Sequence, residues 1–222
     1  MIPISDSIKS KGFPTTNVLL IVFTVFVFLE EIVSPNPDSF IAKYSLIPQL
    51  VNFSNTSTLL PFITAIFLHG GFLHIVSNML FLWVFGDNIE GYFGVLFFLF
   101  IYFASGIVGN ITQYVLAPDS TIPMLGASGA IAGILGSYFI LFPNSKIKTL
   151  VPFFGFLTIV DIPATVMLGY WFLLQVISGA FSLTATSAGG IAFFAHIGGF
   201  ATGIILTLLM RPFISGAFNL RL

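Results

Sequence analysis

Residues 69–94 read HGGFLHIVSNMLFLWVFGDNIEGYFG, and this stretch decides the class of fold. Most of it is apolar, and its charged residues, Asp87 and Glu90, come near its end. An apolar segment of about 20 residues can cross the hydrocarbon core of a bilayer as a helix. His74 and Asn78, four residues apart, would lie on the same face of that helix. Because polar side chains are costly inside a membrane, both are candidate functional residues.

The composition of the whole chain indicates a membrane protein. Of its 222 residues, 57% are hydrophobic and only 7% are charged, whereas a soluble domain carries about 25% charged residues. The formal net charge of -1 excludes the basic surface that a nucleic-acid-binding protein needs. The chain has no cysteine, so disulfides, thiolate metal sites and cysteine nucleophiles are excluded as well.

Apolar segments separated by polar residues, Pro or Gly predict an all-α polytopic bundle of six transmembrane helices. We expect these spans at residues 17–33, 72–89, 92–116, 125–142, 162–181 and 190–210. Glu30 and Glu31 follow the first apolar run in place of a signal-peptide cleavage site, so we interpret that run as a retained span. Residues 59–68 and 151–160 are too short to span, and we expect loops at the membrane surface or dipping into it.

The basic residues predict the orientation of these spans. Basic residues near span ends concentrate on the cytoplasmic side. An N-terminus on that side leaves only Lys43 outside and places six residues in the cytoplasm: Lys9, Lys11, Lys146, Lys148, Arg211 and Arg221. We therefore expect one membrane domain at 17–210, with short cytoplasmic tails at 1–16 and 211–222.

This topology brings four polar side chains to the outer third of the membrane. Ser128 lies just inside the outer end of the fourth span, and His196 about two turns inside that of the sixth, at the depth of His74 and Asn78. A serine becomes a nucleophile when a base takes its proton, and His196 could be that base. His74, Asn78 and the Ser128 backbone N–H could stabilise the oxyanion. Asp161 falls on the cytoplasmic side, which predicts a dyad without a carboxylate.

Glycines in the fourth and sixth spans favour close contact between those two helices. Gly126 and Gly129 flank the serine and leave room for a peptide backbone. Small-residue faces let transmembrane helices approach closely, as a contact between Ser128 and His196 requires. These faces contain Gly129, Gly133 and Gly136 in one span and Gly199 and Gly203 in the other.

Over residues 40–210 the sequence resembles the rhomboid family of intramembrane serine proteases. The resemblance rests on His69, His74 and Asn78 at the spacing of the family's second span and on Ser128 within GASGAIAGILG, residues 126–136. It also rests on His196 within AHIGGFATG, residues 195–203. GYWFLLQVISG, residues 169–179, is similar to the family's fifth span.

The resemblance implies a six-span fold with a water-filled active site open to the extracytoplasmic side. It implies that Ser128 attacks, that His196 is the base, and that His74 and Asn78 serve the oxyanion. The fifth span and the loop at about 181–190 would act as lateral gate and cap. The implied substrates are single-span membrane proteins, and we expect the chain in a prokaryotic cell membrane.

The sequence departs from the family's pattern in two places. Neither Trp83 nor Trp171 lies in the first outer loop, where some members carry a Trp-Arg pair. Ala132 stands four residues after the serine, where some members have an aromatic residue that stacks on the catalytic histidine. The orientation of His196 therefore has less support here.

Several alternatives remain open at this point. His69 either supports the site or ties the loop before Gly70 to the second span. Three histidines could bind a metal, but no cysteine or well-placed carboxylate completes a ligand set, so we expect no metal and no cofactor. A catalytically inactive relative would bind membrane clients instead. A transporter or channel would show intramembrane charges, which the predicted spans lack except at their ends.

Overall fold

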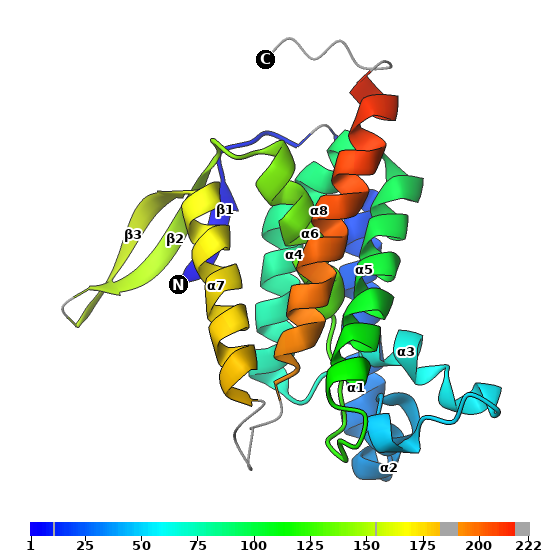
Figure 1. The fold of residues 1–222 in the computed structure, drawn as a ribbon. Coiled ribbons are helices and arrows are strands. Elements are labelled where there is room, and N and C mark those ends of the chain that lie inside the picture. The colour runs from blue at the N-terminus through cyan, green and yellow to red at the C-terminus, as the bar shows by residue number, and fades with distance from the viewer. Residues whose placement is uncertain (11, 154, 183–190, 216–222) are drawn as a thin grey trace.

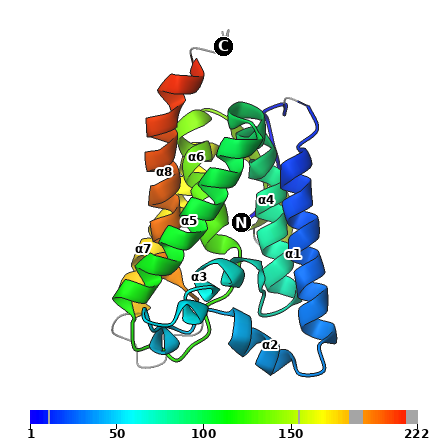
Figure 2. The ribbon, with the colours of Figure 1, turned by 90° about the vertical axis from the view of Figure 1, so that its right-hand side faces the viewer.

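The structure is a computed structural model that describes residues 1–10, 12–153, 155–182 and 191–215. Five of its helices are long and apolar enough to cross a membrane. They are α1 (Thr15–Val33), α4 (Phe72–Phe93), α5 (Val95–Leu116), α7 (Ala164–Ser182) and α8 (Phe193–Ser215), which run side by side in Figures 1 and 2. The prediction of a mostly helical membrane bundle is confirmed.

The predicted fourth span is the shorter helix α6 (Ser128–Leu141), which has 14 residues. At a rise of 1.5 Å per residue it is about 21 Å long, less than the thickness of a hydrocarbon core. It is packed against α4, α5, α7 and α8, and all residues from Gly129 to Tyr138 are buried. The described residues thus contain five helices of spanning length and one short central helix, which is packed among four of them, and the count of six full spans is not confirmed.

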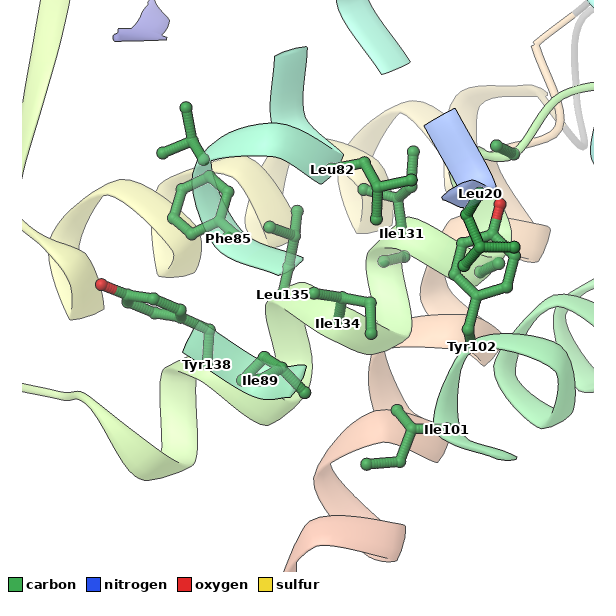
Figure 3. Close-up of a cluster of buried hydrophobic side chains, with 14 of the residues drawn as sticks. Leu20, Leu82, Phe85, Ile89, Ile101, Tyr102, Ile131, Ile134, Leu135 and Tyr138 are labelled. Carbon is green, nitrogen blue, oxygen red and sulfur yellow. The ribbon is translucent and has the colours of Figure 1, made fainter. Parts of the chain in front are cut away.

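The hydrophobic core surrounds α6. Figure 3 shows Ile131, Leu135 and Tyr138 of α6 beside Leu82 and Phe85 of α4. Leu82, Phe85 and Tyr138 are fully buried. Burial of a large apolar side chain between protein helices fixes their spacing, because protein interiors are packed at the density of organic crystals. The core therefore holds α6 at a fixed depth and rotation in the bundle.

Two hydrogen bonds and one glycine fix the ends of α1, α4 and α5 relative to one another. The Glu90 carboxylate of α4 accepts hydrogen bonds from the backbone N–H groups of Thr16 at 3.0 Å and Asn17 at 2.7 Å. These N–H groups lie in the first turn of α1, where no intrahelical partner exists and a negative charge is favoured. Gly94, with a φ of 76°, joins α4 directly to α5, a conformation that favours glycine.

The connection from α1 to α4 consists of short helices at the lower end of the bundle in Figure 1. They are α2 (Pro37–Tyr44), η1 (Pro48–Leu50), η2 (Thr56–Thr58), α3 (Pro61–Thr64) and η3 (Ala65–Phe67). The last two lie within the apolar segment 59–68, predicted as a surface or dipping loop, and their residues Phe62, Ala65 and Ile66 are buried. Asn110 of α5 donates to the Phe62 carbonyl at 2.9 Å and anchors this segment to the bundle.

A three-stranded antiparallel sheet corrects the expectation of a loop at 151–160 and includes part of the N-terminal tail. Residues 151–160, predicted as a loop, belong to the hairpin of β2 (Lys146–Phe153) and β3 (Phe156–Pro163). The tail at 1–16 contains β1 (Ile2–Asp6), which pairs with β2. Polar and apolar residues alternate at the start of β2, as in a strand with one buried face, and Ile147 is fully buried. The Asp6 carboxylate accepts hydrogen bonds from Asn88 of α4 and Tyr138 of α6, so the sheet is fastened to the bundle.

Candidate active site

A cavity of about 710 Å³ opens among α4, α6, α7 and α8. It lies at the end of the bundle where α4, α6 and α8 begin, the lower end in Figure 1. Four side chains singled out from the sequence line it: His74, Asn78, Ser128 and His196. The fold therefore brings residues more than 100 positions apart in the chain to one cavity.

Ser128 is the first residue of α6, and the turn before it determines where its hydroxyl lies. Gly126 has a φ of 128°, which side chains other than glycine rarely adopt, and its N–H donates to the Ala65 carbonyl at 2.9 Å. A Cβ at Gly126 would lie 2.8 Å from His74 Nε2 and 3.7 Å from Ser128 Oγ. The missing side chain at Gly126 therefore lets His74 and Ser128 share one corner of the cavity.

The Ser128 hydroxyl contacts the imidazole of His196. Oγ of Ser128 and Nε2 of His196 are 2.7 Å apart, a hydrogen-bond distance between α6 and α8. The two helices pack backbone to backbone, since a Cβ at Gly129 would lie 3.4 Å from the Ala195 carbonyl. Farther along, a Cβ at Gly199 would overlap the Gly129 carbonyl. The predicted small-residue faces are thus the contact surface between these two helices.

The other side of the His196 ring faces α7. Nδ1 of His196 is 2.8 Å from Oε1 of Gln175. The ring of Trp171 lies 5.8 Å from the His196 ring, with an angle of 34° between the ring planes. Support for the imidazole therefore comes from Gln175 and Trp171 of α7, whereas Ala132 of α6 offers no stacking partner.

Gln175 was missed by the sequence analysis although a signal was available. It is a polar residue in the middle of an apolar span, and such residues are functional candidates by the same reasoning that selected His74 and Asn78. A neutral amide is a less obvious third member than a carboxylate, although its oxygen can accept the same hydrogen bond from the imidazole. The span was noted only for its similarity to the family's fifth span.

His74 and Asn78 present hydrogen-bond donors at the cavity. The N–H of Gly70 donates to Nδ1 of His74 at 3.3 Å, so the ring proton of neutral His74 is on Nε2, the nitrogen beside Gly126. Asn78 is 7% exposed, and its Nδ2 has no hydrogen-bond partner among the residues that the structure describes. A buried amide without a partner is costly, and the Asn78 side chain lines the cavity, so we treat this amide as a candidate donor.

His69 is fully buried, and the cavity lining in the described chain does not include it. Its backbone N–H donates to the Glu31 carboxylate at 3.1 Å, and its ring meets that of His74 edge to face at 5.0 Å. Burial, reinforced by the nearby His74, lowers the pKa of His69 to about 4. These contacts favour the interpretation that His69 ties the loop to the helices and supports the His74 ring.

The sequence also led us to expect a cap over the cavity and no metal site. The predicted cap at about 181–190 falls almost entirely on residues 183–190, which lie outside the described residues. Within the described ranges, no three His, Cys, Asp or Glu side chains are grouped so that they could hold a metal ion.

Comparison with known proteins identifies a family match. The family model described as Rhomboid domain matches residues 56–213. Rhomboid protease GluP of Bacillus subtilis is 33% identical over 160 residues, which make up 72% of this chain and 28% of that protein. Rhomboid protein 1, mitochondrial, of Saccharomyces cerevisiae is 33% identical over 172 residues, or 75% of this chain and 45% of that protein.

A plant protein shows the same degree of similarity. RHOMBOID-like protein 6, mitochondrial, of Arabidopsis thaliana is 34% identical over 155 residues, 68% of this chain and 44% of that protein. The matched part is less than half of the length of each of these three relatives.

Proposed function

Because this chain belongs to the rhomboid family, we propose that it is an intramembrane serine endopeptidase that cleaves single-span membrane proteins. The observation that carries the proposal is the 2.7 Å contact between Ser128 Oγ and His196 Nε2 in a cavity among membrane-spanning helices. A serine hydroxyl beside an imidazole is the minimal pair for acyl transfer.

In the proposed reaction, His196 Nε2 takes the proton of Ser128 as the oxygen attacks the carbonyl carbon of the scissile peptide bond. The imidazolium then gives that proton to the leaving nitrogen, and an acyl-enzyme ester remains on Ser128. A water molecule, deprotonated by His196, hydrolyses the ester and restores the hydroxyl. Each proton that His196 accepts is returned in the same half-reaction.

The oxyanion of each tetrahedral intermediate needs donors near Ser128. We assign this role to the Nδ2 amide of Asn78, the Nε2–H of His74 and the backbone N–H of Ser128. The first two line the cavity, and the third is in the first turn of α6, where backbone N–H groups lack intrahelical partners. Hydrogen-bond donors that already occupy these positions before the reaction stabilise the negative charge that develops on the oxygen in the transition state.

The location of the protein in the membrane supports the proposal that its substrates are membrane proteins. It is an integral membrane protein of the rhomboid family, with its cavity among spanning helices. The basic residues support a cytoplasmic location for both termini, and the Bacillus relative is compatible with a prokaryotic cell membrane. Under this proposal a substrate helix enters from the bilayer and unwinds at Ser128.

Cleavage of a single-span reporter in proteoliposomes, together with fluorophosphonate labelling, tests the proposal. Ser128→Ala is expected to reduce cleavage to background, because loss of the serine in such a unit costs about a millionfold in kcat. Ser77→Ala is the matched control. Its hydroxyl also lies at the cavity but donates to the His74 carbonyl of its own helix at 2.8 Å.

We expect the Ser77→Ala protein to cleave and label like the parent, and both variants to unfold at the parent's temperature. A folded parent that neither cleaves nor labels would indicate an inactive, client-binding relative. Cleavage that survives Ser128→Ala would refute the serine mechanism.

A further inference from the structure

We infer that Gln175 is a positioning residue that fixes the tautomer and the orientation of His196, an inference that rests on the proposed function. Its Oε1 lies 2.8 Å from His196 Nδ1, while Nε2 on the other side of the ring lies 2.7 Å from Ser128 Oγ. Gln175, His196 and Ser128 thus form one chain of hydrogen bonds from α7 through α8 to α6.

The Gln175 amide determines the direction of these hydrogen bonds. Nε2 of Gln175 donates to the backbone carbonyl of Trp171 at 3.2 Å. A carbonyl can only accept a hydrogen bond, so the amide nitrogen faces Trp171 and the amide oxygen faces His196. The contact with Trp171, one turn earlier on α7, therefore determines which end of the amide the histidine meets.

The amide oxygen in turn determines the tautomer of the histidine. Oε1 only accepts, so the proton of neutral His196 is on Nδ1, and Nε2 has a free lone pair directed at Ser128. This is the tautomer that a general base for Ser128 requires. In the other tautomer, Nε2 would carry the proton and could not accept one from the hydroxyl.

Gln175 acts on the histidine and not on the substrate. The cavity lining in the described chain includes Trp171 and His196 but not Gln175, which lies behind the imidazole. Because the Trp171 ring also lies beside the imidazole, α7 holds His196 by two contacts. The Gln175 amide neither gains nor loses a proton during the proposed reaction.

An amide in this position orients the base without adding charge. A carboxylate would also stabilise the imidazolium, but a charged side chain among apolar spans is costly. The helices α5, α6 and α7, which pack against α8, contain no Asp, Glu, Lys, Arg or His. Among the described residues that line the cavity, His74 of α4 is the one titratable side chain besides His196.

Reporter cleavage by three variants tests the inference. Gln175→Met keeps the length of the side chain but removes the acceptor, and we expect kcat to fall by about 10- to 100-fold with KM nearly unchanged, as general-base catalysis is partly lost. Gln113→Met is the matched control. Gln113 Oε1 accepts from the Phe194 backbone N–H of α8 at 3.0 Å and does not touch the imidazole, so kcat should stay within about twofold of the parent.

Gln175→Glu keeps an acceptor and adds a charge. We expect it to recover most of the kcat lost in Gln175→Met, and to move the acidic limb of the kcat profile to higher pH. The added carboxylate would stabilise the imidazolium, so a higher pH would be needed to restore the neutral base. A carboxylate at position 175 that did not lie beside the imidazole would not move that limb.

Equal kcat values for Gln175→Met and the parent, or a Gln175→Glu profile indistinguishable from that of Gln175→Met, would overturn the inference. In both cases Ser128-dependent cleavage by the parent would leave the proposed function intact. If the parent itself fails to cleave and to label, the proposed function fails first, and Gln175 has no base to position.

Discussion

No side chain fits between Gly199 of α8 and the carbonyl oxygen of Gly129 in α6. A Cβ built on Gly199 overlaps that oxygen, and one on Gly203 overlaps the carbonyl oxygen of Gly133 one turn farther along. The two helices therefore touch through their backbones over successive turns. Since Ser128 and His196 lie just before this contact in their helices, their 2.7 Å separation depends on it.

Replacement of Gly199 by alanine is expected to separate the two helices. Overpacking of a close contact typically costs about 1 to 3 kcal/mol, and a small shift of α8 would break the Ser128–His196 hydrogen bond. We predict a lower unfolding temperature in detergent and a loss of reporter cleavage. Gly169→Ala in α7 is the control, because a Cβ there meets only Phe139 Cε2, at 3.9 Å. Equal behaviour of the two variants would contradict the proposed role of the backbone contact.

Removal of either proposed oxyanion donor should slow cleavage without abolishing it. Loss of one such donor typically lowers kcat by about 100- to 1,000-fold, and the remaining donors still act. We predict losses of this size for both Asn78→Ala and His74→Ala. Initial rates at saturating reporter will measure them, with Ser77→Ala as the control from the same helix face of the cavity. Parental rates in both variants would refute the assignment of these donors.

The buried His69 predicts a dependence of stability on pH. Its pKa is lowered from 6.5 to about 4 in the folded protein, so between these values the unfolded chain binds more protons than the folded one. Stability contributed by neutral His69 is therefore present above about pH 6.5 and is lost as the pH falls toward 4. We predict that His69→Phe flattens the fall in unfolding free energy between pH 7.5 and pH 4.5, since phenylalanine cannot take up a proton.

The comparison must be made against the parent, because the other titratable groups are the same in both proteins and contribute equally to the two slopes. Denaturant unfolding at a series of pH values will measure the two slopes. Parallel curves for the parent and His69→Phe would show that His69 takes up its proton equally well in the folded protein.

The long helices could be predicted from the sequence because each is an apolar segment that specifies its own secondary structure. The predicted spans 17–33 and 92–116 agree closely with α1 and α5. The sheet could not be predicted in the same way. β1 and β2 lie some 140 residues apart in the chain, and neither alone shows that the other completes its hydrogen bonds.

The site was predicted where a motif places reactive side chains on separate spans, as with Ser128 and His196. What the motif could not predict is how the imidazole is held, because its partner on α7 is a neutral amide and not the carboxylate of a triad. The role of Gln175 depends on a distance of 2.8 Å between two helices, which spacing along the chain does not encode.

Under the proposed function, the packing of α7 would link access to the cavity with the state of the base. Its buried residues are Ala164, Met167 and Leu168 near its start and Gly179 near its end. Between them, Trp171 and Phe172 are partly buried and pack against Phe200 of α8. A displacement of this stretch away from α8 would widen the cavity and at the same time break the Gln175–His196 hydrogen bond. The cavity would then be open along α7 only while His196 lacks its hydrogen bond to Gln175. Under this proposal, a peptide that enters past α7 would meet a histidine without its Gln175 partner, and cleavage would follow only after the helix had returned to α8.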